Sequence, residues 1–447
     1  MITRLEVDGF KSLQNFAVDL EPFTVFIGPN SAGKSNVLEA LELLSRLASQ
    51  PIAEAFKEGR GRASDQFTRV GSESVRSMRL AVEFLLYGTF SPGHPPGPEP
   101  QSRYRYELTI ERQALPSGTE RLLARGERFR AMRAEEDGWI KSRPEFLNYA
   151  GYADQGTDIF VSAMEQDATK RRIIGRPIEQ FEERQVPLSH TVLSQMMYLE
   201  TLQVRANLAH CRPLRIGAAS LGEPSDRIDS GELAPDAANL PTVLAGLPAS
   251  LLGEIRAELV ALVPGIASFD VVPEGDEMRI DFELSGGDRM PARLVSDGTL
   301  RVLVLLTALR LDPRPHLVCI EEPENGIYPG RLRALLDLFR EETIRAHDDT
   351  EALAQFDAIL QQEQASGLST NMLPTQILLT THSPVILSAL RKHPRHLRFV
   401  DMVRREGHRV TRVRTVGRPE PGDHGRTTVS PREIDLLLDA AQSEEPA

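Results

Sequence analysis

The pattern of apolar and polar positions at the start of the chain predicts two strands, a buried strand, a loop and a helix. Residues 4–8 and 16–20 alternate between apolar and polar side chains, whereas residues 23–27 form a short β-rich apolar run. From Asn36 to Leu47, apolar side chains recur at helical spacing. The glycine-rich segment 28–35 therefore lies between a buried strand and a helix.

The rest of the chain follows in strand-like and helix-like blocks. Strands are expected near 77–86 and 103–111, on either side of a loop rich in proline and glycine at 91–98. From about 145 to 265 the pattern is mostly helical and less regular. The remaining blocks predict strands at 268–272 and 277–284, a helix after Asp297, a strand at 317–320, a helix after Pro329 and a strand at 376–380.

Composition and charge narrow the class of protein. A chain of 447 residues has room for two or three structural units. Its net charge of −12 argues against a surface that is basic throughout, but a local basic patch remains open. Cys211 and Cys319, far apart in sequence, offer no disulfide framework. With no signal-peptide layout and no apolar run of membrane-spanning length, we expect a cytoplasmic protein without membrane contact.

The segment between the buried strand and the helix meets the pattern G-x-x-x-x-G-K-[ST]. Glycines at 28 and 33 permit a close approach of the backbone, and the exposed N–H groups with the helix N-terminus form an anion cradle. Lys34 is expected to reach the β- and γ-phosphates of ATP, and Ser35 to supply a hydroxyl to Mg²⁺. The predicted nucleotide-binding residues are Gly28, Pro29, Asn30, Ser31, Ala32, Gly33, Lys34, Ser35 and Asn36.

Two consecutive carboxylates, Glu321 and Glu322, follow the apolar strand 317–320. Ligands bind at such strand ends in open parallel sheets. In a nucleotide site, Glu321 would hold Mg²⁺ directly or through water, and Glu322 would orient or deprotonate the attacking water. Taken alone, the pair also fits a solvated strand end.

Ser296 and His382 are two further candidates. Ser296 stands at the start of an apolar helix, where a serine is either an N-cap or part of a second phosphate-binding end. His382 ends the strand 376–380, and a lone histidine there is either structural or catalytic.

In this order, the four elements resemble the ATP-binding-cassette (ABC) type of ATPase head in the SMC, RecF and OLD-like group of AAA family ATPases. The resemblance covers residues 1–50 and about 280–400, and Phe10-Lys11-Ser12 fits its usual opening. It identifies 28–35 as the Walker A loop, Ser296-Asp297-Gly298 as a shortened signature motif and 320–323 as Walker B. It also identifies 324–329 as the D-loop region and His382 as the switch histidine.

The middle of the chain resembles a RecF-like subgroup of bacterial ATPases, at 193–195 and 233–240. The resemblance implies that Gln195 is the Q-loop residue. One departure is Glu321, because the wider ABC pattern has aspartate at this position.

The resemblance implies a P-loop NTPase fold of α/β class, with a mixed sheet and flanking helices. We expect the N-terminal part of the head at 1–144, a largely helical insertion at 145–267, the C-terminal part at 268–416 and a tail at 417–447. Within the third part, residues 343–372 are polar and helix-prone and predict a surface excursion.

The family mechanism implies a nucleotide-sandwich homodimer. Ser296 and Gly298 of one subunit would close over the γ-phosphate held by the other. Glu322 would be the general base, His382 the γ-phosphate sensor, and Lys34 with Ser35 and Glu321 the phosphate and Mg²⁺ platform.

Several hypotheses remain for the process that ATP hydrolysis drives. Arginines concentrated over 391–414, with a smaller basic group at 170–172, favour DNA contact in repair, maintenance or anti-phage defence, or else a soluble surface. An OLD-like nuclease is disfavoured, because no carboxylate domain follows His382, so a nuclease would be a partner protein. The long gap between Ser35 and Ser296 disfavours a transporter subunit. The alternative is a slowly hydrolysing, nucleotide-gated scaffold that regulates a partner effector or nuclease.

Overall fold

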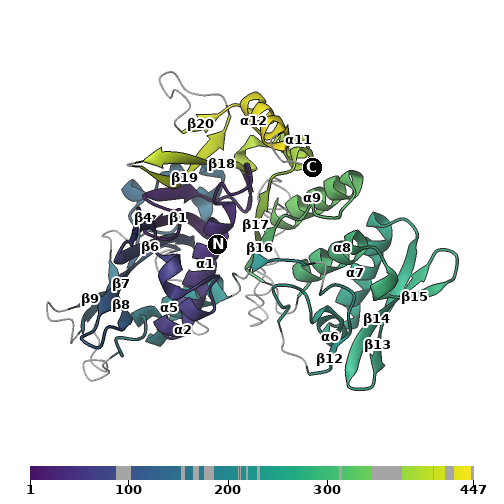
Figure 1. Ribbon diagram of the computed structural model, residues 1–447, viewed down its shortest axis with the longest axis horizontal. Coiled ribbons are helices and arrows are strands. Elements are labelled where there is room, and N and C mark those ends of the chain that lie inside the picture. Colours follow the sequence, from purple (N-terminus) through teal and green to yellow (C-terminus); the bar gives the residue numbers. More distant parts are fainter. Residues whose placement is uncertain are drawn as a thin grey trace.

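The fold consists of two large sheets with helices between and beside them, and a smaller third sheet (Figure 1). The structure is a computed structural model. It describes residues 1–86, 102–152, 157–164, 171–175, 186–209, 211, 213–217, 220–228, 232–311, 315–344, 375–405, 407–417 and 427–443. The loop 91–98 lies entirely outside these residues, and so does the polar segment 343–372 apart from its first two residues.

The first sheet is antiparallel, and its seven strands come from the first part of the chain. Its strand order is β10 (Arg171–Gly175), β9 (Asp158–Met164), β8 (Glu120–Ala131), β7 (Arg103–Ala114), β6 (Ser77–Leu85), β1 (Ile2–Asp8) and β2 (Phe16–Asp19). A separate hairpin joins β4 (Arg69–Val70) to β5 (Glu73–Ser74).

The second sheet holds the predicted nucleotide motifs. Its order is β11 (Pro213–Leu214), β16 (Leu317–Glu321), β17 (Gln376–Thr381), β3 (Phe23–Ile27), β18 (Leu397–Arg405), β19 (His408–Val416) and β20 (Thr428–Val429). The strands from β11 to β18 are parallel. Their carboxyl ends therefore meet at one edge, as the α/β prediction requires.

The third sheet belongs to the lobe drawn on the right of Figure 1. It contains β12 (Ser225–Asp226), β14 (Glu277–Leu284), β13 (Ile266–Glu274) and β15 (Arg289–Pro291). The strands predicted at 268–272 and 277–284 are confirmed as parts of β13 and β14.

The longer helices sit against the second sheet and the third. The helices are α1 (Lys34–Leu47), α2 (Ile52–Lys57), α3 (Gly138–Lys141), α4 (Val192–Gln195), α5 (Leu199–Ala209), α6 (Leu240–Gly246), α7 (Ala249–Leu262), α8 (Asp297–Leu309), α9 (Pro329–Ile344), α11 (Pro384–Leu390) and α12 (Pro431–Ser443). No helix in the described part of the chain is both long and apolar enough to cross a bilayer.

The second sheet separates two hydrophobic cores. Phe26 of β3 packs into the core that also contains α1 and the first sheet, whereas Val25 and Ile27 pack into the core with α8 and α9. All five residues of β3 are buried. Burial on both faces explains why this strand reads as an apolar run rather than as an alternation.

The stretch from 145 to 267 differs from the helical insertion that the sequence suggests. Its first part supplies β9 and β10, which extend the first sheet, and β11 forms an edge of the second. Among the described residues of the rest, the helices are α4 to α7, and β12 lies between α5 and α6. Likewise, the segment expected to be a tail adds β20 to the second sheet, and Ile434 of α12 is buried in the core.

Cys211 and Cys319 are neighbours in space. Their Sγ atoms are 3.5 Å apart in the buried interior, and both are free thiols. The contact forms because β11 follows Cys211 closely and pairs with the strand that contains Cys319. Two segments that are distant in sequence therefore meet beside the Walker B strand.

Candidate nucleotide site

The phosphate loop leaves β3 and enters α1 in a conformation that requires its two outer glycines. A Cβ atom on Gly28 would lie 1.9 Å from the carbonyl oxygen of Val400. Gly33 has φ of 93°, and a Cβ there would lie 2.0 Å from Oγ1 of Thr411. Both positions exclude any side chain, because the β18–β19 hairpin packs directly on the loop.

Lys34 folds back onto its own loop. Its Nζ atom donates hydrogen bonds to the carbonyl oxygens of Gly28 and Pro29, at 2.8 and 2.9 Å. Burial lowers the pKa of Lys34 to about 8, and the carboxylates of Glu322 and Glu324 oppose the shift. The ammonium group is thus held in the loop at the cost of its solvation.

Ser35 and Glu321 meet at the end of β16. Ser35 Oγ donates to Glu321 Oε2 at 2.8 Å, across 286 positions of sequence. The other oxygen, Oε1, accepts from Nε of Arg215 at 2.8 Å. A hydroxyl and a carboxylate at this spacing are oxygen donors of the type that Mg²⁺ prefers beside nucleotide phosphates.

Glu322 and His382 lie at the ends of the neighbouring strands β16 and β17. His382 Nδ1 is 3.4 Å from Glu322 Oε1 and 3.7 Å from Glu324 Oε1. Glu322 has φ of 47°, the left-handed region that a non-glycine residue adopts at a cost of about 1–3 kcal/mol. This turn directs the backbone away from the strand immediately after Glu321.

A hydrogen-bond chain fixes the other side of the loop. Asn36 Nδ2 donates to Ser12 Oγ at 2.6 Å, and Ser12 Oγ lies 2.6 Å from Thr411 Oγ1. Thr411 Oγ1 in turn donates to the carbonyl oxygen of Ala32 at 3.1 Å. The opening segment, α1 and β19 therefore hold the phosphate loop together.

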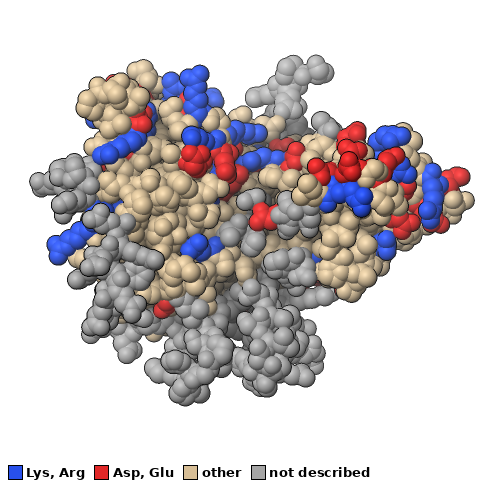
Figure 2. Space-filling view, turned by 90° about the horizontal axis from the view of Figure 1, so that it is seen from below, with Lys and Arg blue, Asp and Glu red and all other residues tan. Residues whose placement is uncertain are grey.

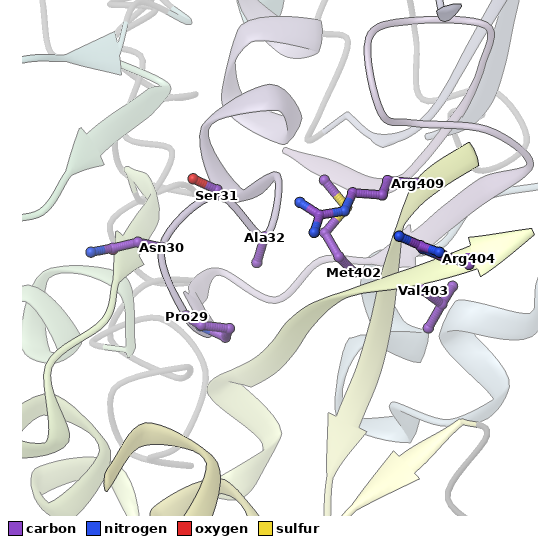
Figure 3. A pocket seen from close by; sticks show the side chains of 8 residues that line it. All are labelled: Pro29, Asn30, Ser31, Ala32, Met402, Val403, Arg404 and Arg409. Atoms are coloured by element: carbon purple, nitrogen blue, oxygen red, sulfur yellow. The ribbon is translucent and has the colours of Figure 1, made fainter. Parts of the chain in front are cut away.

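The apex of the loop borders a cavity of about 260 Å³. Pro29, Asn30, Ser31 and Ala32 line one side, and Ser31 also has a positive φ of 60°. The β18–β19 hairpin lines the other side with Met402, Val403, Arg404 and Arg409 (Figure 3).

Ser296 caps α8 and is exposed. Its Oγ accepts from Thr299 N at 3.4 Å and lies 3.0 Å from Thr299 Oγ1. Gly298, by contrast, is buried, and a Cβ there would lie 2.1 Å from the carbonyl oxygen of Gly326. The start of α8 therefore packs directly on the D-loop region, and α8 lies in the other lobe from α1 (Figure 1).

The structure places Gln195 apart from the phosphate loop. Thr191, which caps the short helix ending at Gln195, donates to the carbonyl oxygen of Leu47. Leu47 is the last residue of α1, and Lys34 is the first. Fourteen helical residues, a length of about 20 Å, separate the two ends.

The sequence reasoning did not find Arg215 or Thr411. Arg215 reaches Glu321 because Leu214 pairs with Ile320 in parallel register, which places the next residues side by side. A two-residue edge strand gives almost no periodic signal. Thr411 lies within an arginine-rich strand, where a single threonine gives no separate signal.

Residues 23–388 match the family described as "AAA domain, putative AbiEii toxin, Type IV TA system". The chain belongs to this family. It is 28% identical to the DNA replication and repair protein RecF of Rhodococcus erythropolis over 171 residues, 34% of this chain and 41% of that protein. It is 41% identical to the OLD nuclease of Thermus scotoductus over 44 residues, 10% of this chain and 8% of that protein.

The chain spans less than half the length of these curated relatives. Among solved structures, an Smc head bound to the C-winged helix domain of ScpA is similar over 93% of this chain and 97% of that chain, with a TM-score of 0.49 and 14% identity. The family match and the named relatives confirm the expected group: an ABC-type, RecF-, SMC- and OLD-like AAA family protein with a P-loop α/β fold.

Proposed function

We propose that the protein is a Mg²⁺-dependent ATPase. The observation that carries this proposal is the arrangement of three adjacent parallel strands, β16, β17 and β3. Their carboxyl ends bring Lys34, Ser35, Glu321, Glu322 and His382 to one edge of the sheet. Such edges are where ligands bind in open α/β sheets.

Each side chain has a distinct chemical task in this proposal. The backbone N–H groups of residues 28–35 and the ammonium of Lys34 bind the phosphates. Ser35 and Glu321 would hold Mg²⁺, which neutralises charge that develops on the phosphates. His382, whose Nδ1 lies 3.4 Å from Glu322 Oε1, would contact the γ-phosphate.

Glu322 is the proposed general base. Its carboxylate follows Glu321 directly, and Asn325 Nδ2 donates to its Oε2 at 3.0 Å. Removing one positioned base costs about 10²- to 10⁴-fold in rate. Glu322→Gln should therefore lower ATP turnover by at least about 100-fold while leaving ATP binding intact. Phosphate release and binding of a fluorescent ATP analogue measure the two effects, and unchanged turnover would contradict the assignment.

The active form in this proposal is a nucleotide-sandwich homodimer. Ser296 is exposed, and so are two large apolar side chains in the adjoining segments: Leu294, by 67%, shortly before α8, and Tyr328, by 71%, in the D-loop region. They flank the contact between Gly298 and Gly326. An apolar surface beside an exposed helix N-terminus supports a docking face for the phosphate side of a second copy.

We also propose that the ATPase acts on DNA, as the names of its RecF relatives suggest. The arginines at 391–414 are not all available for contact with DNA, because several are already paired with carboxylates. Arg391 pairs with Asp435 and Arg395 with Glu145, while Arg398 is buried against Glu21. Arg412 and Arg414 both pair with Asp401.

The smaller basic group at 170–172 gives little support to the proposed contact with DNA. Lys170 lies outside the described residues, and Arg171 is bonded to the carbonyl oxygen of His190. Basic and acidic side chains are interspersed on the face that Figure 2 shows. Net charge is thus balanced locally over much of this surface.

Within 391–414, the exposed arginines that have no ion pair among the described residues lie at the tip of the β18–β19 hairpin. Arg404 lies directly opposite Arg409 in the strand pair, and Arg405 follows. Like charges in that position repel each other. Figure 3 shows the guanidinium of Arg409 directed toward the phosphate loop, with Arg404 beside it. This tip is the surface that we assign to the phosphodiester backbone.

Fluorescence anisotropy with labelled duplex DNA tests this assignment. Reversing both charges, Arg404→Glu with Arg409→Glu, should weaken binding by roughly tenfold or more and reduce the slope of log K against log salt by about two. Lys392→Glu, which reverses the charge of an exposed lysine in the same sequence cluster, is the control and should have little effect. Absence of DNA binding by the wild-type protein at low salt would exclude this part of the proposal.

A nucleotide-gated scaffold that regulates a partner effector or nuclease is the second candidate. It shares the site and the dimer but needs little turnover. If the wild type hydrolyses ATP no faster than Glu322→Gln, the scaffold explains the protein better than the ATPase.

A further inference from the structure

Arg215 and Ser35 together occupy both oxygens of the Glu321 carboxylate. Nε of Arg215 lies 2.8 Å from Oε1, and Ser35 Oγ lies 2.8 Å from Oε2. The guanidinium also reaches Glu42, where Nη2 lies 2.7 Å from Oε2. Its side chain is 27% exposed and that of Glu321 is 14% exposed, so the pair is largely shielded from solvent.

The fold holds Arg215 in this position through backbone register. β11 runs parallel to β16, with Leu214 opposite Ile320. The residues that follow, Arg215 and Glu321, therefore emerge side by side. Glu42 is itself paired with Arg46 at 2.9 Å, so the second partner of Arg215 is also fixed in place.

A divalent cation and this guanidinium compete for one carboxylate. Glu321 is the proposed Mg²⁺ carboxylate, and its charge is already balanced by Arg215. A second cation placed between Ser35 and Glu321 is repelled by the guanidinium at short range, where charge interactions are strong. The phosphates of a nucleotide would supply the negative charge that offsets this repulsion.

We propose that Arg215 is a positioning residue that keeps the site from binding free divalent cations until a nucleotide arrives. In the nucleotide-free protein, the guanidinium neutralises Glu321 and aims its second oxygen at Ser35. Metal then enters with the triphosphate rather than before it. The inference rests on the proposed Mg²⁺ site at Ser35 and Glu321, and adds a residue that controls the order of loading.

Binding of Mn²⁺ to the nucleotide-free protein tests the inference, with bound and free ion distinguished by electron paramagnetic resonance. Arg215→Gln should bind Mn²⁺ roughly tenfold more tightly than the wild type, because one repelling charge is gone. Glu42→Gln is the matched control. It removes the other partner of Arg215 but leaves the guanidinium on Glu321, so the affinity for Mn²⁺ should not rise.

Two further variants distinguish a folding defect, an error in the proposed metal site and an error in the proposed role of Arg215. Arg215→Lys keeps the charge and should stay close to the wild type, which guards against a folding defect in Arg215→Gln. Glu321→Gln should weaken binding of Mn²⁺ in the presence of ATP, and if it does not, the proposed metal site itself is wrong. If Glu321→Gln has that effect but folded Arg215→Gln binds free Mn²⁺ no better than the wild type, Arg215 serves only to join β11 to β16.

Discussion

The ammonium of Lys34 donates to the carbonyl oxygen of Gly28 at 2.8 Å, so the lysine is bound to its own loop. Incoming phosphates must replace this contact and its neighbour at Pro29. The loop thus supplies a preformed position for one positive charge, held by the backbone that will surround the phosphates.

The affinity for ATP should depend on pH through Lys34. Burial lowers its pKa to about 8 in the nucleotide-free protein, and phosphates bind the protonated form. Below pH 8 the lysine is already protonated, so affinity should be flat. Above pH 8 binding must take up a proton, and affinity should fall by up to about tenfold per pH unit. Titrations of a fluorescent ATP analogue at pH values below and above 8 measure how the affinity changes with pH. Lys34→Ala should abolish this pH dependence.

Gln195→Ala should leave Mg²⁺-dependent ATP binding within about twofold of the wild type, because the helix that ends at Gln195 packs at the far end of α1. Isothermal titration with and without Mg²⁺ checks this. A large loss of ATP affinity that appears only with Mg²⁺ would instead support Gln195 as the Q-loop residue.

The first sheet depends on a fully buried ion pair. Arg103 Nε lies 2.5 Å from Asp137 Oδ2, and neither side chain is exposed. Asp137→Ala should lower the free energy of unfolding by about 3–5 kcal/mol, because the buried guanidinium loses the carboxylate to which it is hydrogen-bonded. Lys57→Ala, which breaks an exposed pair with Glu54, should cost less than about 1 kcal/mol. Urea unfolding compares the two, and equal effects would contradict the buried role.

The same pair gives a pH dependence of stability. Burial alone would raise the pKa of Asp137, but the hydrogen bond and charge of Arg103 outweigh it, and the pKa is lowered. The stabilisation is therefore complete above the usual aspartate pKa and is lost as the pH falls through the lowered value. Acid unfolding of the wild type should show a midpoint that Asp137→Ala shifts to higher pH.

The local parts of the fold and site were predictable from the sequence. Gly28 to Ser35 carry their own spacing, and the buried strand before them reads as apolar because both its faces are covered. The carboxylates at 321 and 322 likewise follow a recognisable strand. What could not be predicted depends on pairing between distant segments. Arg215 reaches Glu321 only through the register of a two-residue strand.

The strands within the expected helical insertion could not be predicted for a related reason. β9 joins the first sheet by pairing with β8, and β10 pairs in turn with β9, but their sequences alternate too weakly to predict this. The arginines at 391–414 likewise show that the sequence does not reveal which charged side chains are paired in the fold. Arg412 and Arg404 look equivalent in sequence, yet one is neutralised by Asp401 and the other is exposed at the hairpin tip.

Ser296→Arg should separate nucleotide binding from hydrolysis. The larger, charged side chain at the exposed start of α8 should block docking of a second copy, while the phosphate loop of the same chain is untouched. ATP binding should stay within about twofold of the wild type, and turnover should fall by about 100-fold or more. Sedimentation velocity in the Glu322→Gln background should show a monomer where the parent forms a dimer with ATP.

The most direct test of the composite site is to mix Lys34→Ala with Ser296→Ala, which removes the signature hydroxyl without the bulk that blocks docking; the composite site predicts that each variant alone is inactive. Each mixed dimer contains one intact site, made from the phosphate loop of one chain and the signature segment of the other. With random pairing, the mixture should recover about a quarter of the wild-type ATPase rate, because half of the dimers are mixed and each has one of two sites. No recovery at any ratio, in a sample where sedimentation shows mixed dimers, would contradict the account.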